Sequence, residues 1–146
     1  MAFKKSARAR KYFTVAEANA TLPLVRAIVR DIMELAHNLR ERQDRLTRAR
    51  PSERTVMLEA HAEELQQAEA EFERDQDRLA EYARELKNLG VELKDYFTGL
   101  VDFPSRLDGR EVYLCWRFGE DEIAHWHELD AGFAGRQKIR QSAACK

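Results

Sequence analysis

The sequence predicts an α+β protein, in which a long antiparallel, coiled-coil-like helical hairpin carries a small C-terminal antiparallel β-meander. Between residues 14 and 90, apolar residues recur at steps of three and four, the period of an amphipathic helix. After Gly90 the period changes to two, and Asp108-Gly109 forms a two-residue hairpin signal between strand-like segments. Because the chain has 146 residues, we expect one domain over residues 1–146.

Composition limits the class of protein. Apolar residues make up 44% of the chain and charged residues 35%, which is typical of a soluble protein. No apolar run approaches the roughly 20 residues that cross a bilayer. The basic N-terminus is not followed by the apolar stretch of a secretory signal. Two cysteines, Cys115 and Cys145, do not make a disulfide framework, so we expect a cytoplasmic protein with free thiols and no membrane segment.

The net charge of −1 hides a segregation of charge along the chain. Residues 1–13 contain five basic residues and no acidic one, which predicts a disordered basic tail. Residues 22–50 are net basic and residues 51–90 net acidic, so we expect these two stretches to face each other. The predicted organisation is a basic tail over 1–13, a helical hairpin over 14–90, a β-meander over 91–137 and a tail over 138–146.

Two start signals precede the first long helix. Thr14 and Glu17 have the spacing of a capping box. Thr21, followed by Pro23 in the first turn, has the features of a second N-terminus. We therefore expect a short helix over 14–20, a bend, and a long helix from about 22 to 49.

The second helix is expected over about 53–89, with Ser52 as its cap and Gly90 as its C-terminal glycine. When the chain folds back around residue 52, apolar positions of the two helices coincide, for example Ile32 with Phe72. This agreement favours an antiparallel hairpin.

One position in the predicted pairing is unfavourable. Asp75 falls opposite Val29, which requires Arg26 or Arg30 to reach its carboxylate.

Apolar residues also lie on the flanks of the hairpin, outside the predicted seam. Either the C-terminal region or a second copy of the chain covers them. We favour a homodimer with a four-helix arrangement. These flanking residues are Ile28, Met33, Leu35 and Met57.

Turn geometry fixes the register of the predicted sheet. With Asp108-Gly109 as the first loop, Asp102 pairs with Cys115. With Gly119-Glu120-Asp121 as a three-residue loop, Cys115 pairs with His125. One face then packs on the helices and contains Val101, Phe103, Val112, Leu114, Trp116, Phe118, Ala124 and Trp126. The opposite face contains Leu100, Asp102, Tyr113, Cys115, Arg117, Ile123, His125 and His127.

The second face supports more than one interpretation. Asp102, Cys115, His125 and His127 fall within cross-strand reach of one another and form a plausible zinc set. The isolated His-X-His spacing is a weak signal, because no paired Cys-X-X-Cys or helical His-Glu-X-X-His motif accompanies it. A catalytic triad is disfavoured because the cysteine is the middle member of the row.

Two further interpretations concern binding and plain solvation. Arg117, Glu128 and Arg136, with the glycines of "DAGFAGR", are candidates for binding an anion or another ligand. The simplest interpretation is a solvated sheet face on which Cys115 is a small, half-buried residue.

These observations favour a non-enzymatic scaffold or binding module. The alternative is a metal-binding protein or metal-dependent enzyme centred on Asp102, Cys115 and His127, with Glu128 as a base or as an orienting group. A weak, non-specific nucleic-acid binder is a third class, disfavoured because acidic residues interrupt the arginines and aromatic residues are scarce there. The arginines concerned are Arg40, Arg42, Arg45, Arg48, Arg50 and Arg54.

Residues 12–29, "YFTVAEANATLPLVRAIV", and 99–137 carry motifs that resemble a prokaryotic family of uncharacterised proteins, domain of unknown function 2203. The resemblance implies a fold but no established activity. In that family the position of His125 is more usually aromatic, which shifts the candidate ligands to Asp102, Cys115, His127 and Glu128. The matching motifs are Glu17-Ala-Asn19, Leu22-Pro23, Val101-Asp102-Phe103-Pro104, Leu114-Cys115-Trp116-Arg117, Gly119-Glu120, Trp126-His127-Glu128, Gly132-Phe133 and Gly135-Arg136.

Overall fold

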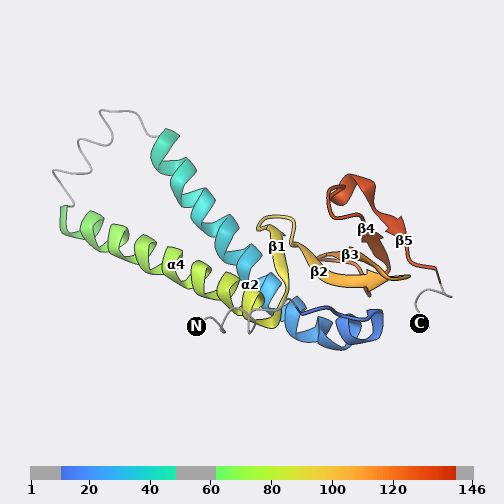
Figure 1. Ribbon diagram of the computed structural model, residues 1–146. Helices are drawn as coiled ribbons and strands as arrows, with labels where there is room; N and C mark the ends of the chain where they lie inside the picture. Colours follow the sequence, from blue (N-terminus) through green and yellow to red (C-terminus); the bar gives the residue numbers. More distant parts are fainter. Residues whose placement is uncertain (1–10, 49–61, 141–146) are drawn as a thin grey trace, which may run out of the picture.

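The computed structural model describes residues 11–48 and 62–140, which form two long helices followed by an antiparallel sheet (Figure 1). The strand order follows the chain, so the sheet is a meander, as predicted. The α+β class with a helical hairpin is confirmed. The elements are α2 (Val15–Arg48), α4 (Ala62–Leu89), β1 (Glu92–Asp95), β2 (Leu100–Leu107), β3 (Arg110–Arg117), β4 (His125–His127), the 3-10 helix η1 (Phe133–Gly135) and β5 (Gln137–Lys138).

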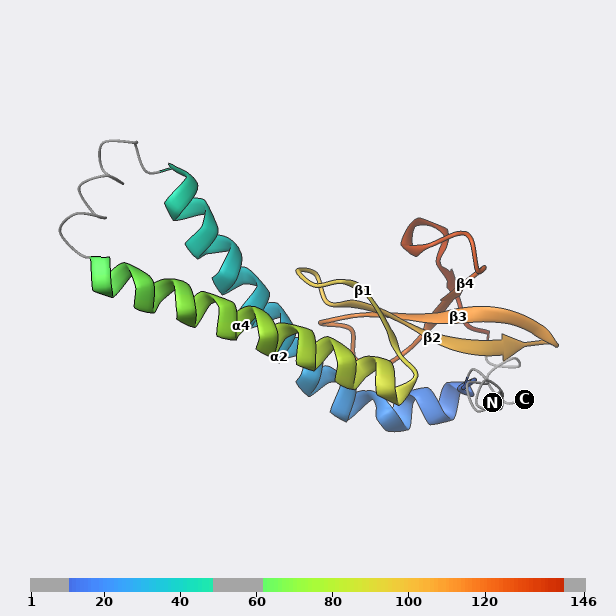
Figure 2. The ribbon, with the colours of Figure 1, turned by 60° about the vertical axis from the view of Figure 1, so that its left-hand side comes forward.

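Helix α2 begins at the predicted capping box. The Thr14 amide donates to Glu17 Oε1, and the Glu17 amide donates to Thr14 Oγ1, both at 3.0 Å. The predicted break near residue 21 is wrong, because α2 continues through Pro23. Thr21 Oγ1 donates to the Glu17 carbonyl at 2.9 Å instead of capping a new helix. The ribbon changes direction between its first turns and its later part (Figures 1 and 2), as expected when an interior proline removes one helical hydrogen bond.

Both predicted tails overlap the folded part of the chain. Phe13, placed in the basic tail, is buried, and its amide donates to the Pro104 carbonyl at 2.7 Å. Lys138, placed in the C-terminal tail, belongs to β5, and the next amide, that of Ile139, donates to Ala124 O at 2.9 Å. The rest of the basic tail, residues 1–10, lies outside the described residues.

Helix α4 ends at Leu89 and is followed by Gly90, whose φ of 93° is left-handed, as predicted for a C-terminal glycine. The predicted start of this helix lies outside the described residues, as do Ser52 and Met57. Within the described residues, α4 contributes one buried side chain, Leu86, whereas α2 contributes eight. The helices diverge toward their distal ends (Figures 1 and 2).

The predicted environment of Asp75 is wrong. Its carboxylate accepts hydrogen bonds from Arg42 and Arg78, not from Arg26 or Arg30. Asp75 therefore lies beside the distal part of α2 rather than opposite Val29. The error lies in the axial register of the two helices. The Arg42 guanidinium also lies 5.8 Å from the centre of the Phe72 ring, so this part of α4 faces the distal part of α2, and the predicted pairing of Ile32 with Phe72 is wrong as well.

The sheet covers part of the flank that the sequence left open. Ile28 is buried, and Met33 packs partly buried against the core. An ideal Cβ on Gly99, in the β1–β2 turn, would lie 2.6 Å from Met33 Sδ and 2.9 Å from Val29 Cγ1. The sheet therefore approaches α2 so closely at this turn that only a hydrogen fits there.

The predicted register of β2, β3 and β4 is confirmed: Asp102 pairs with Cys115, and Cys115 pairs with His125. The Asp108-Gly109 turn has positive φ at both residues (53° and 79°), as a type I′ turn requires. The predicted three-residue loop is wrong, because β3 ends at Arg117 and β4 begins at His125.

The longer loop also changes the position of Ile123. This residue was predicted on the polar face, but it is buried in the core, and its amide donates to Asn19 Oδ1 at 2.8 Å.

Candidate metal centre

Asp102 on β2, Cys115 on β3 and His127 on β4 converge from three successive strands. One carboxylate oxygen, the thiol sulfur and one imidazole nitrogen all lie within 4.8 Å of one another. The exposed fractions of the three residues are 3%, 0% and 2%. The interpretation of this face as solvated, with a half-buried Cys115, is therefore wrong at these three positions. We call the three residues the Asp–Cys–His cluster.

The hydrogen bonds of His127 define which nitrogen faces the cluster. Nδ1 lies 2.7 Å from the backbone carbonyl oxygen of Glu128, which can only accept, so Nδ1 carries a proton. Nε2 lies 3.0 Å and 3.1 Å from the two carboxylate oxygens of Asp102. An unprotonated Nε2 would set its lone pair against those of the carboxylate. A proton or a metal cation is therefore required between the two groups.

The electrostatics of the cluster disfavour a free thiolate. Burial, followed by the negative charge of the nearby Asp102 carboxylate, raises the pKa of Cys115 to about 12. Burial also raises the pKa of Asp102, against the opposing effects of His127 and Lys94. Catalytic cysteines need the opposite, a lowered pKa, so the raised pKa of Cys115 argues against a cysteine nucleophile.

His125 occupies the predicted register position opposite Cys115, but its side chain is not part of the cluster. Arg136 Nη2 donates to His125 Nδ1 at 3.0 Å. Burial and the nearby Arg136 charge lower the pKa of His125. The structure thus brings together three of the four predicted metal ligands.

The other candidate residues make contacts around the cluster. The Glu128 carboxylate binds Arg110 Nη1 at 2.9 and 3.1 Å, so only the backbone carbonyl of Glu128 reaches His127. Arg136 binds Glu120 at 2.8 Å. The guanidinium groups of Arg136 and Arg117 lie 4.6 Å and 5.2 Å from the ring centre of Phe133.

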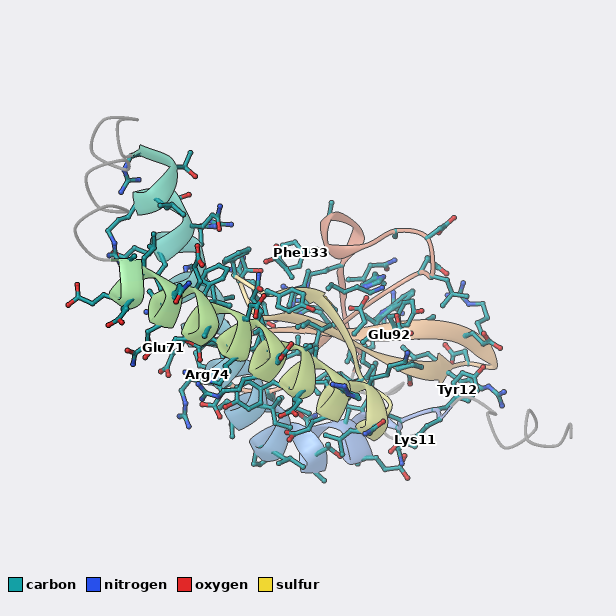
Figure 3. All side chains as sticks on the ribbon, turned by 90° about the vertical axis from the view of Figure 1, so that its left-hand side faces the viewer. Lys11, Tyr12, Glu71, Arg74, Glu92 and Phe133 are labelled. Atoms are coloured by element: carbon teal, nitrogen blue, oxygen red, sulfur yellow. The ribbon has the colours of Figure 1, made fainter. Side chains whose placement is uncertain are left out.

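The sequence does not predict that Glu92, on β1, lies beside the cluster. Glu92 pairs with Asp102 in register, and the Tyr113 hydroxyl donates to Glu92 Oε2 at 3.1 Å. The Tyr113 ring lies 5.5 Å from the His127 ring. Figure 3 shows Glu92 and Phe133 at the sheet, away from the distal ends of the helices. The four residues of β1 are too few to produce a clear period-two signal.

The fold and the cluster together define a class of small α+β proteins, in which a helical hairpin packs on a five-stranded meander with three ligand-type side chains buried between neighbouring strands. The chain belongs to the family of uncharacterised conserved proteins DUF2203, whose family model matches residues 11–139. This match confirms the resemblance found in the sequence. No curated protein and no solved structure matches the chain. Across the described residues, neither helix combines the length and apolar character that a bilayer crossing requires.

Proposed function

We propose that this protein binds a divalent transition metal ion, with zinc as the first candidate, at the Asp–Cys–His cluster. The observation that carries the proposal is the convergence of three ligand-type groups, all buried and within 4.8 Å of one another. A sulfur, an imidazole nitrogen and a carboxylate oxygen suit zinc better than magnesium or calcium, which prefer oxygen ligands alone.

The orientation of His127 supports the same proposal. Metal-binding histidines commonly donate their second ring N–H to a carbonyl, which fixes the tautomer, and His127 Nδ1 does so to Glu128. A divalent cation would replace the proton between His127 and Asp102. It would also favour the thiolate of Cys115, which is otherwise disfavoured in this buried position.

The burial of the cluster favours a binding role over catalysis. A substrate would need access to the ion, but the exposed fractions of the three side chains do not exceed 3%. The proposed role is therefore metal binding coupled to the stability of the fold, because a preformed site rarely exists in an unfolded chain.

Metal analysis and cobalt substitution test this proposal. Metal-depleted protein titrated with Co²⁺ should bind about one ion per chain and show the absorption of a cobalt–thiolate bond. Cys115→Ser should abolish that absorption, and Asp102→Asn and His127→Gln should weaken binding by about tenfold or more. His125→Gln is the matched control and should bind like the wild type. Protein that binds neither Zn²⁺ nor Co²⁺, with a Tm unchanged by chelator, would rule out the proposal.

A second candidate function is a homodimeric scaffold built on the hairpin. It is favoured by the small contribution of α4 to the core within the described residues, and by Leu46, which is 48% exposed on the distal part of α2. The last turn of α2 is basic and the first turn of α4 acidic, so a second copy could pair them antiparallel. Light scattering should give a dimer mass that falls in Leu46→Glu, whereas a monomer mass at all concentrations excludes the dimer.

A further inference from the structure

A metal ion cannot reach the Asp–Cys–His cluster without a local opening of the sheet, because the three side chains are almost fully buried. Asp102 and Cys115 lie on eight-residue strands that pair along their whole length. His127 lies on β4, which has three residues and is flanked by the two-residue β5. Local opening favours the segment with the fewest contacts, so the edge formed by β4 and β5 is the part that opens most easily.

The side chain of Arg136 fastens this edge to the rest of the sheet. Its Nη2 lies 2.8 Å from Glu120 Oε1, 3.0 Å from His125 Nδ1 and 3.5 Å from the Cys115 carbonyl oxygen. Glu120 is itself anchored, because its Oε1 accepts from the Arg117 amide at 3.0 Å. We call these contacts the Arg136 clasp. It connects the β3–β4 loop, β3 and β4 through one guanidinium group, and the Arg136 side chain is 12% exposed.

We propose that Arg136 is a positioning residue that holds β4, and with it His127, over Asp102 and Cys115, and that metal ions enter and leave when this edge opens. The second half of the proposal rests on the proposed function. Arg136 does not contact the ion in this scheme. It acts through the position of β4, and therefore affects the rates of metal exchange more than the affinity.

A further feature of the clasp favours reversible opening. Arg136 Nε is buried and has no hydrogen-bond partner among the described residues. Burying a donor without an acceptor is unfavourable, and opening the edge exposes this N–H to water. The closed state is thus stabilised by the ion pair with Glu120 and opposed by the unsatisfied Nε.

The test compares Arg136→Gln and Glu120→Gln with Arg117→Gln as the matched control. Arg117 lies near the same Phe133 ring, but its side chain is not part of the clasp. Hydrogen exchange is measured in metal-free protein at the Ile139 amide, which bonds to Ala124 across the edge. We expect exchange about tenfold faster in both clasp variants, the effect of losing one charge-assisted contact, and unchanged exchange in the control.

The second measurement is Co²⁺ exchange by stopped flow. In the clasp variants, association and dissociation should both accelerate by about tenfold, with less than about a threefold change in Kd. Arg136→Lys, which retains the charge, should recover part of the slow exchange. Ile139 protection equal to the wild type in both clasp variants overturns the positioning role. A loss of Co²⁺ affinity by about tenfold or more, the loss expected for Asp102→Asn and His127→Gln, overturns the exchange role. If the wild type binds no metal, the proposed function fails, while the hydrogen-exchange experiment still decides whether Arg136 holds the edge.

Discussion

His127 Nε2 lies 3.0 Å from one carboxylate oxygen of Asp102 and 3.1 Å from the other, although the two residues are 25 positions apart in the sequence. The residues face each other across β3, and each is almost completely removed from solvent. Such a pair depends on both members, because the loss of one leaves a buried polar group without its partner.

Asp102→Ala should therefore destabilise the metal-free protein by about 2 kcal/mol, because it leaves His127 Nε2 buried and unpaired. Urea unfolding of the metal-depleted protein measures this effect. The control is Glu111→Gln, an exposed carboxylate on β3, which should change stability by no more than about 0.5 kcal/mol. Equal stabilities for the two variants would contradict the importance of the Asp102–His127 contact.

Cys115 should resist alkylation in the native metal-free protein at neutral pH, because it is fully buried and its pKa is raised to about 12. Mass spectrometry after iodoacetamide treatment of Cys145→Ser protein measures this, and denaturant should restore the reaction. Rapid labelling of the folded protein would show that the cluster is accessible.

The raised pKa of Cys115 also predicts how stability depends on pH. The unfolded thiol ionises near its ordinary value of 9.0, whereas the folded thiol remains protonated to about 12. The stabilising effect is therefore complete below about pH 9 and is lost as the pH rises from there. Cys115→Ala should show a weaker loss of stability than the wild type over this alkaline range.

Gly99→Ala should destabilise the protein by about 3 kcal/mol, through strain and overpacking combined. Its φ is 73°, and a Cβ there would meet Met33 Sδ at 2.6 Å and Phe118 Cβ at 2.7 Å. Gly109→Ala is a matched control with a φ of 79° and no atom within 4 Å of the new Cβ. The Gly109→Ala variant should lose only about 1 kcal/mol of unfolding free energy, the cost of backbone strain alone. Thermal unfolding of both variants checks whether the close contact with α2 matters.

Asp75 should contribute to stability in a pH-dependent way. Its hydrogen bond with Arg42, followed by that with Arg78, lowers its pKa below the ordinary 3.8. The contribution of the Asp75 charge to stability is present above pH 3.8 and disappears as the pH falls through the lowered pKa of the folded state. The stability difference between wild type and Asp75→Asn should shrink over the same acid range in urea titrations. A difference that stays constant with pH would mean that the Asp75 charge does not matter.

The register of the sheet could be predicted because its first turn is strongly specified. Asp108-Gly109 allows a single tight hairpin geometry, and this places Asp102 opposite Cys115. The second turn was assigned the wrong length, but its register is correct because Leu114 and Trp126 must share the buried face. The hydrophobic pattern, rather than the loop, determines the pairing there.

The burial of the Asp–Cys–His cluster could not be predicted from the same pattern. Alternation of apolar and polar residues indicates which face a side chain occupies, but not what lies beside it. The neighbours of the cluster come from short segments, with Glu92 on β1 and Arg136 just before β5. Helix α2 shows a related limit. Pro23 predicts a first turn, but the tertiary packing of its neighbours extends the helix through it.

Asp102, Cys115 and His127 lie at least 12 positions apart in the sequence, and no two of them share a strand. A short peptide excised from this chain would therefore hold at most one of the three groups. The metal binding proposed above would therefore require strands β2, β3 and β4 to be paired. A limited proteolytic cut in the Asp108-Gly109 turn, followed by separation of the fragments, should abolish it even though every side chain survives intact.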